Sequence, residues 1–156
     1  MEASRPASAD DIPRVVELAE LMRAELAAMR GGAIWLERDA WPEPLADAYT
    51  AVLDRDDARL FVGTIDAVIV GFGAVVVEAL RSGARLGVVT DLFVELAARE
   101  VGVGEALAES LVDHCRTVGC VGVDASALPG HRAAKNFFEA HGFTARALTM
   151  HHRLQP

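Results

Sequence analysis

The spacing of apolar and polar residues changes along the chain, and each spacing predicts a type of element. Between residues 12 and 29 apolar residues recur every three or four positions, which is typical of an amphipathic helix. Gly31 is expected to end that helix. A second helix is predicted over about residues 44–53, and a short strand over residues 2–6.

The middle of the chain has the pattern of strands rather than helices. Residues 59–65, 68–80 and 85–94 are rich in apolar β-formers. The pairs Asp66-Ala67 and Ser82-Gly83 separate them as turns. These three segments predict an antiparallel meander.

Helical spacing returns after the meander. Apolar residues recur at helical intervals from Gly104 to Val118, a short strand is predicted over residues 121–126, and a further helix over residues 131–141. Residues 143–153 are predicted to add one or two final strands around Leu148. This order predicts an α/β (α+β mixed) fold, with a mixed, mostly antiparallel central sheet of six to seven strands flanked by about four helices.

Length and composition narrow the classes of protein. The 156 residues suit a single domain over residues 1–156. A net charge of −8 argues against nucleic acid as a partner, because an acidic surface repels phosphate backbones. Two cysteines are too few for a disulfide framework or a zinc site, so no metal is expected. No signal peptide or membrane span is recognised, so we expect a cytoplasmic protein without a membrane partner.

The clearest candidate site lies between the last meander strand and the following helix. Gly102 and Gly104 let a ligand approach the unpaired N–H groups of the helix start without obstruction by Cβ atoms. Arg99 adds a cationic donor. The expected ligand is an anion, above all a pyrophosphate, although similar glycines also occur in turns that merely start a helix.

Two common nucleotide motifs do not fit this segment. A Walker motif needs Lys and then Ser or Thr after the last glycine, where Glu105 and Ala106 stand. A dinucleotide fingerprint needs a parallel strand before the loop and a small residue where Leu107 stands.

Two blocks of residues resemble the motifs of the GNAT superfamily of N-acyltransferases. Motif A is resembled by Arg99-x-x-Gly102-x-Gly104, preceded by Asp91-Leu92-Phe93-Val94. Motif B is resembled by Ala134-x-x-Phe137-Phe138-x-x-x-Gly142-Phe143. The resemblance includes the element order and covers nearly the whole chain. It implies a GNAT-like sheet, acetyl-CoA as co-substrate and an amine of a small molecule or peptide as acceptor, and it leaves a homodimer possible.

The resemblance also implies roles for individual residues. The strand before the loop would pair with the pantetheine arm of the cofactor, and the loop amides would hold its pyrophosphate. A backbone N–H near Val94 would stabilise the oxyanion of the tetrahedral intermediate. The implied cofactor contacts are Leu92, Phe93, Val94, Arg99, Val101, Gly102, Val103, Gly104, Ala106, His131, Phe137 and Phe138.

Two departures from the family's pattern leave the proton-transfer residues open. Phe138 stands where a Tyr often protonates the thiolate, and Thr90 stands where a Glu often serves as base. Asp91 is then the candidate catalytic residue, although strand alternation points it away from Thr90 and it also suits a structural role. Asp124 and Ser126 are further candidates for the base.

The acceptor is expected beside the loop of residues 31–41. Trp35 and Trp41 suit either stacking on a substrate or packing over the sheet, and Glu37 and Asp39 are available to hold an ammonium group. The sequence therefore predicts an acetyl-CoA-dependent N-acetyltransferase that works by direct attack in a ternary complex. The alternative is a GNAT-fold module that binds acyl-CoA without turnover, which the missing Tyr and Glu favour.

Overall fold

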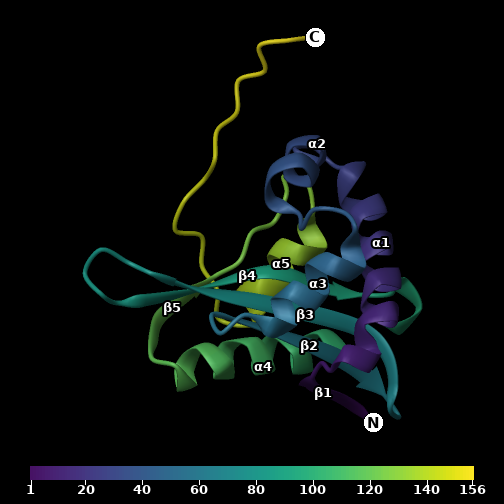
Figure 1. Ribbon diagram of the computed structural model, residues 1–156. Coiled ribbons are helices and arrows are strands. Elements are labelled where there is room, and N and C mark those ends of the chain that lie inside the picture. Colours follow the sequence, from purple (N-terminus) through teal and green to yellow (C-terminus); the bar gives the residue numbers. More distant parts are fainter.

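Five strands form one sheet in chain order in the computed structural model, which describes all 156 residues (Figure 1). Antiparallel pairing joins the first four strands, which are β1 (Glu2–Pro6), β2 (Ala58–Ile65), β3 (Val68–Ala79) and β4 (Arg85–Val94). β5 (Cys120–Asp124) runs parallel to β4 and pairs only with its residues Arg85–Val88. The second half of β4 therefore has no strand beside it on the β5 side.

Helices cover both faces of the sheet (Figure 1). One face carries α1 (Ile12–Ala27) and α3 (Leu45–Asp54), and the other carries α4 (Val103–Thr117). The chain between α1 and α3 forms the short α2 (Gly32–Ile34) and a helical turn over Trp35–Asp39. α5 (Arg132–Ala140) follows β5.

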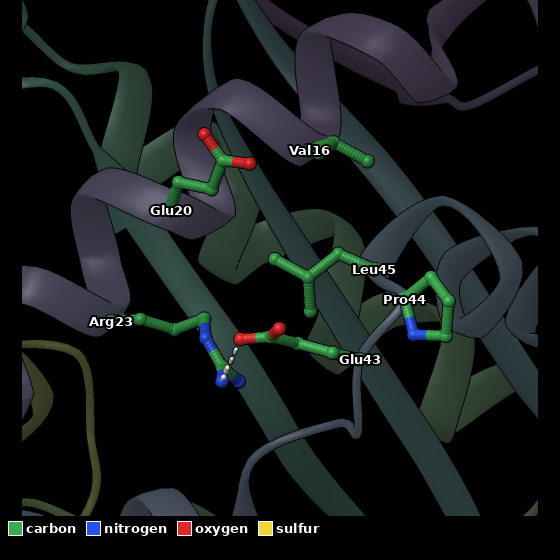
Figure 2. Close-up of a pocket in the computed structure, with 6 residues that line it drawn as sticks. All are labelled: Val16, Glu20, Arg23, Glu43, Pro44 and Leu45. Atoms are coloured by element: carbon green, nitrogen blue, oxygen red, sulfur yellow. Dashed lines mark hydrogen bonds and ion pairs between the residues drawn. The ribbon is translucent and has the colours of Figure 1, made fainter.

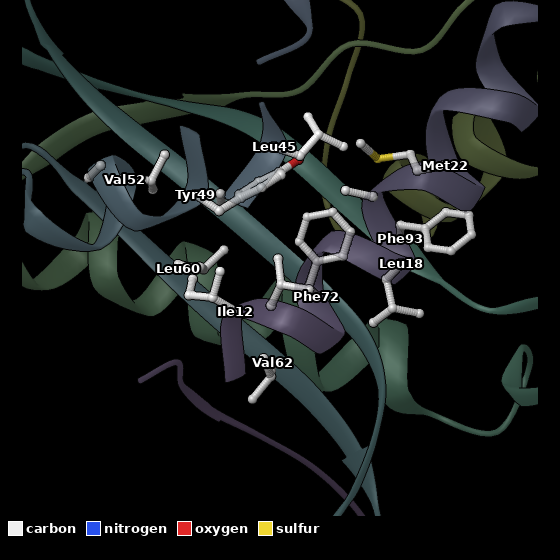
Figure 3. Close-up of a cluster of buried hydrophobic side chains, with 14 residues drawn as sticks. Ile12, Leu18, Met22, Leu45, Tyr49, Val52, Leu60, Val62, Phe72 and Phe93 are labelled. Atoms are coloured by element: carbon white, nitrogen blue, oxygen red, sulfur yellow. The ribbon is translucent and has the colours of Figure 1, made fainter. Parts of the chain in front are cut away.

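Each face has its own apolar core. On the α1 and α3 face a cluster of 14 buried residues includes Leu18, Tyr49 and Phe72, which Figure 3 shows with the other members of this core. The rings of Tyr49 and Phe72 meet edge to face, with centroids 5.6 Å apart. On the other face, Leu107 and Leu111 of α4 belong to a second cluster of eight. β4 therefore lies between one core on the α1 and α3 face and another on the α4 face. The candidate site lies at the end of this strand.

The predicted mixed, mostly antiparallel sheet is confirmed, but the strand count is five rather than six to seven. The prediction of final strands over residues 143–153 is wrong for this structure, because no residue after Ala140 belongs to a helix or strand. An extended segment becomes a strand only when another strand shares its backbone hydrogen bonds. Beyond Arg146, whose side chain binds Asp124 of β5, the chain runs away from the sheet (Figure 1). None of the helices combines the length and the hydrophobicity that a membrane span requires.

Candidate active site

The turn between β4 and α4 presents a run of unpaired backbone N–H groups. None of the amides of residues 100–105 donates a hydrogen bond within the chain, and the first helical bond runs from Ala106 N–H to Gly102 O, at 3.0 Å. Glu100 and Gly102 have φ values of 67° and 102°, and left-handed residues in such a turn aim successive N–H groups into one concavity. We call residues 100–105 the amide cradle. With the positive end of the α4 dipole behind it, the cradle suits an anion.

The strand edge beside the cradle is also free. Glu95 N–H donates to Val70 O on β3 at 2.9 Å. Backbone groups of successive strand residues point to opposite edges, so those of Phe93 also face β3, while those of Leu92 and Val94 face the gap left by β5. The ring of Phe93 is buried in the core. Of the three residues expected to pair with a pantetheine arm, Leu92 and Val94 are thus placed to do so through their backbones.

Arg99 is held at the start of the cradle by two partners. Its Nε donates to Val94 O at 2.7 Å, and its two terminal nitrogens each lie 3.0 Å from an oxygen of Glu25 on α1. The guanidinium also lies over the Phe93 ring, 5.3 Å from its centroid. Arg99 therefore links α1 to the end of β4. Glu25 neutralises the positive charge of Arg99, which the sequence analysis expects to bind a phosphate.

The aromatic residues of α5 close the other side of the cradle. A Cβ atom on Gly104 would lie 3.3 Å from the Phe137 ring, so a larger residue there would press against that ring. Phe138 packs against Phe137 with ring centroids 5.7 Å apart. His131 directly precedes α5, is half-buried and makes no side-chain hydrogen bond. The structure thus brings Phe137 to the cradle and leaves His131 at the start of the neighbouring helix.

Asp91 is the most buried polar group near the site, with 3% of its surface exposed. Three donors hold its carboxylate: Trp41 Nε1 at 2.8 Å, Tyr49 OH at 2.7 Å and Thr90 Oγ1 at 2.7 Å. Burial raises the pKa of Asp91, and the hydrogen bonds from Tyr49, Thr90 and Trp41 oppose that shift. Burial, together with the Asp91 charge, also raises the pKa of Tyr49. This geometry keeps the carboxylate away from solvent and fixes Trp41.

A β-bulge explains why Thr90 reaches Asp91. In the β3–β4 register Ala74 pairs with Asp91 and Val75 pairs with Val89, which leaves Thr90 as an extra residue. The prediction that strand alternation separates the Thr90 and Asp91 side chains is therefore wrong. Bulges break the alternation of side chains, and a regular strand pattern does not reveal where they occur.

Neither of the other candidate bases, Asp124 and Ser126, is placed to accept a proton from a substrate at the end of β4. Both carboxylate oxygens of Asp124 accept from Arg146, and this contact lowers the pKa of Asp124. Ser126 is exposed in the loop after β5. Trp35 and Trp41 both pack against the core cluster on the α1 and α3 face, which agrees with the packing alternative. No group of three or more His, Cys, Asp or Glu side chains is arranged to hold a metal ion.

An open hollow of about 350 Å³ lies between α1 and the start of α3 (Figure 2). Arg23 crosses it, donating to Glu43 at 3.1 Å and to the Trp41 carbonyl at 3.0 Å. Glu20 faces the same space and has no hydrogen-bond partner. Glu20 therefore makes one wall of the hollow acidic. Arg23 connects the hollow to the backbone of Trp41, whose side chain binds Asp91.

Sequence reasoning missed two partners in this region, Tyr49 and Glu25. Tyr49 follows Leu45 by one helical turn and so shares its apolar face, which was a signal for burial. No local sequence pattern reveals either pairing, because Tyr49 and Asp91 are 42 positions apart and Glu25 and Arg99 are 74 positions apart.

Comparison with known proteins agrees with the geometry. The model of the acetyltransferase (GNAT) family matches residues 19–143. No curated protein sequence matches the chain.

Three solved structures illustrate the shared fold. A mutant of the BH1408 protein from Bacillus halodurans has a TM-score of 0.82 at 17% identity, covering 97% of this chain and 99% of that one. Glucosamine-6-phosphate N-acetyltransferase from Arabidopsis thaliana has a TM-score of 0.70 at 20% identity, covering 99% of each chain. An aminoglycoside acetyltransferase from an uncultured soil metagenomic sample, solved with sisomicin, has a TM-score of 0.74 at 18% identity, covering 99% and 96%.

The family match spans most of the chain and includes both the amide cradle and α5. The structural similarity independently supports the same sheet and helix arrangement. The chain therefore belongs to the GNAT family of acetyltransferases.

Proposed function

We propose that this protein transfers an acetyl group from acetyl-CoA to a primary amine of a small molecule or peptide, with residues 1–156 acting as one domain. The observation that carries the proposal is the amide cradle, six consecutive unpaired N–H groups directly beside the free edge of β4. Membership of an acetyltransferase family supports acyl transfer as the chemistry.

The residues present fit the anionic end of acetyl-CoA. The cradle N–H groups and the start of α4 would hold the pyrophosphate oxygens without a lysine. Ala106 was expected among these donors, but its amide forms the first bond of α4, so Glu105 supplies the free amide at this end. Leu92 and Val94 would hold the pantetheine arm as an added strand.

Transfer needs stabilisation of negative charge on the thioester oxygen. The Val94 N–H faces the gap at the end of β4 and would donate to that oxygen as it becomes an oxyanion. The Val94 carbonyl is already bound by Arg99, which holds this peptide in place. Phe138 cannot protonate the departing thiolate, so we assign both proton transfers to solvent. Water takes the proton that the amine nitrogen loses as the amide forms, and water protonates the thiolate, which is a tolerable leaving group.

We assign Asp91 a positioning role rather than that of a base. Its carboxylate is buried and already accepts three hydrogen bonds, so an amine cannot reach it without disrupting Trp41 and Tyr49. Its effect on the reaction is then indirect, through the placement of Trp41 beside the acceptor side of β4.

An amine acceptor is supported by charge and by similar proteins. The net charge of −8 and the unpaired Glu20 in the hollow near Trp41 favour a cation over an anion. Two of the similar structures are named as acetyltransferases of glucosamine-6-phosphate and of an aminoglycoside, both amino sugars.

The test is a panel of primary amines assayed for release of free CoA thiol, combined with calorimetric titration of acetyl-CoA. We expect saturable binding and turnover with at least one amine. Acetyl-CoA binding without thiol release across the panel would favour the non-catalytic module, which Phe138 and Thr90 keep as the second candidate. Absence of binding would contradict both functions.

A further inference from the structure

We propose that Cys115 and Cys120 form a redox-sensitive dithiol pair, which a low-molecular-weight disulfide oxidises to an intramolecular disulfide joining the end of α4 to the start of β5. These are the only two cysteines of the chain. Both are free thiols, with Cys115 buried and Cys120 half-buried. Neither belongs to the candidate active site, because the amide cradle lies at the opposite end of α4.

The turn that ends α4 explains why the two side chains meet. The helix ends at Thr117, and Gly119 follows with a φ of 81°, the left-handed conformation of a glycine at the C′ position. Its N–H donates to Arg116 O at 3.2 Å, which is one of the two hydrogen bonds that define a Schellman motif. With Gly119 at C′, Cys115 occupies position C3 and Cys120 occupies position C″. Side chains at these two positions commonly contact each other in this motif.

Both thiols also lie on the α4 face of the sheet. Cys115 belongs to the apolar cluster of that face, and Cys120 packs against the same cluster. The Cys115 sulfur lies so close to β4 that a Cβ atom on Gly87 would overlap it. Cys120 pairs with Arg85, two positions before Gly87 on the same strand, and the Arg85 side chain reaches the end of α4 to donate to Val118 O at 3.0 Å. The sheet therefore holds the two cysteines beside each other.

The two thiols interact and differ in their access to solvent. Burial, the charge of Cys120 and a hydrogen bond with Cys120 together raise the pKa of Cys115 to about 12. Cys115 therefore remains protonated and donates to the Cys120 sulfur. Because a thiolate needs access to its oxidant, the half-buried Cys120 is the attacking residue and the buried Cys115 is the resolving residue.

The oxidant is a disulfide of the form RSSR. The Cys120 thiol loses its proton to solvent, attacks one sulfur of RSSR, forms a mixed disulfide and releases one RS⁻. The Cys115 thiol then loses its proton to solvent and attacks the Cys120 sulfur, so that the Cys115–Cys120 bond forms and a second RS⁻ leaves. Both RS⁻ ions take up a proton. Two protein thiols thus lose two electrons, and RSSR is reduced to two RSH.

The new bond would close the short loop of residues 115–120. A disulfide restricts the unfolded chain, so the oxidised protein should unfold at a higher temperature, by roughly 4 °C for a loop of this length. In a reducing compartment the pair would be reduced at rest and would oxidise only transiently, which is typical of a sensor rather than a permanent crosslink.

The experiment incubates the full-length native protein with mixtures of oxidised and reduced glutathione, alkylates the remaining thiols and measures the mass. We expect both thiols to be lost in one step, the mass before alkylation to fall by about 2 Da without added glutathione, and dithiothreitol to restore both thiols. Cys115→Ala should retain one glutathione on Cys120. Cys120→Ala is the matched control and should retain none, because its remaining thiol is buried.

Four results would overturn the proposal. Both thiols could stay unmodified until the protein is unfolded in urea, or glutathione could remain on Cys120 of the parent protein without resolution. A crosslink between two chains would show that the cysteines do not pair within one chain. An unchanged unfolding temperature after oxidation would contradict the link between α4 and β5. The measurements on the parent protein decide the question even where a variant folds poorly.

Discussion

The Tyr49 hydroxyl donates a 2.7 Å hydrogen bond to Oδ2 of Asp91, joining α3 to β4 at a buried point on the α1 and α3 face of the sheet. Trp41 and Thr90 donate to the other carboxylate oxygen. The packing of α3 and the position of Trp41 therefore both depend on the Asp91 carboxylate, which lies on the face of β4 where the acceptor is expected.

Tyr49→Phe should lower the free energy of unfolding by about 1 to 3 kcal/mol, because it removes one donor from a buried carboxylate while preserving the ring. Urea denaturation measures this loss. The matched comparison is the same change in an Asp91→Asn background, where the cost should be smaller because the acceptor is no longer charged. Equal costs in the two backgrounds would contradict the direct coupling.

Gly102→Ala should weaken acetyl-CoA binding by at least about fivefold, the loss of roughly one hydrogen bond, because Gly102 has a left-handed φ of 102° within the amide cradle. Calorimetric titration measures the affinity. Gly119→Ala is the control at the other end of α4, with φ of 81° and open space around its Cβ position. Both changes should cost about 1 kcal/mol of stability, but only the first should change affinity. The same loss of affinity in both would count against the cradle.

The Arg99–Glu25 pair should contribute a coupling of about 0.5 to 1 kcal/mol, limited because both side chains are about one-third exposed. A double-mutant cycle with Arg99→Gln and Glu25→Gln, followed by urea denaturation, measures the coupling. It should decrease at high salt, since solvent ions screen partly exposed charges. Additive single-variant effects would mean that the pair does not link α1 to the turn after β4.

Asp11 should make stability fall in acid. Arg5 and the Ser8 amide hold the carboxylate and lower the pKa of Asp11 from 3.8 to about 2. A lowered pKa means that its stabilising effect is complete above 3.8 and is lost as the pH falls through about 2. Because Arg5 is half-exposed, we expect a contribution of about 1 to 2 kcal/mol at neutral pH.

Unfolding of Asp11→Asn across that pH range tests this expectation. The variant should be less stable than the parent at neutral pH and should converge with it in strong acid. Asp10→Asn, at an exposed neighbouring position without a hydrogen bond, should follow the parent throughout. A constant difference between Asp11→Asn and the parent would show that the carboxylate does not titrate as described.

The parts of the structure that depend on local pattern were predictable from the sequence. The meander, the α4 start and the position of Gly102 follow from spacing and glycine placement, since each is decided by a few consecutive residues. The Thr90 bulge was not predictable, because it depends on the register of β3 against β4. The partners of Asp91 and Arg99 were hidden for a similar reason, since they come from distant helices on the same face of the sheet. The strand pattern around Leu148 was recognised, but a pattern does not say whether a partner edge is present.

The central claim, that the amide cradle and the adjoining edge of β4 hold acetyl-CoA, is tested most directly by backbone amide NMR during titration with acetyl-CoA. The account predicts that the largest chemical-shift changes fall on residues 100–105 and on Leu92 and Val94, with smaller changes near Phe137. Saturation without changes at these amides, or changes centred on the hollow at Glu43 and Leu45, would contradict it.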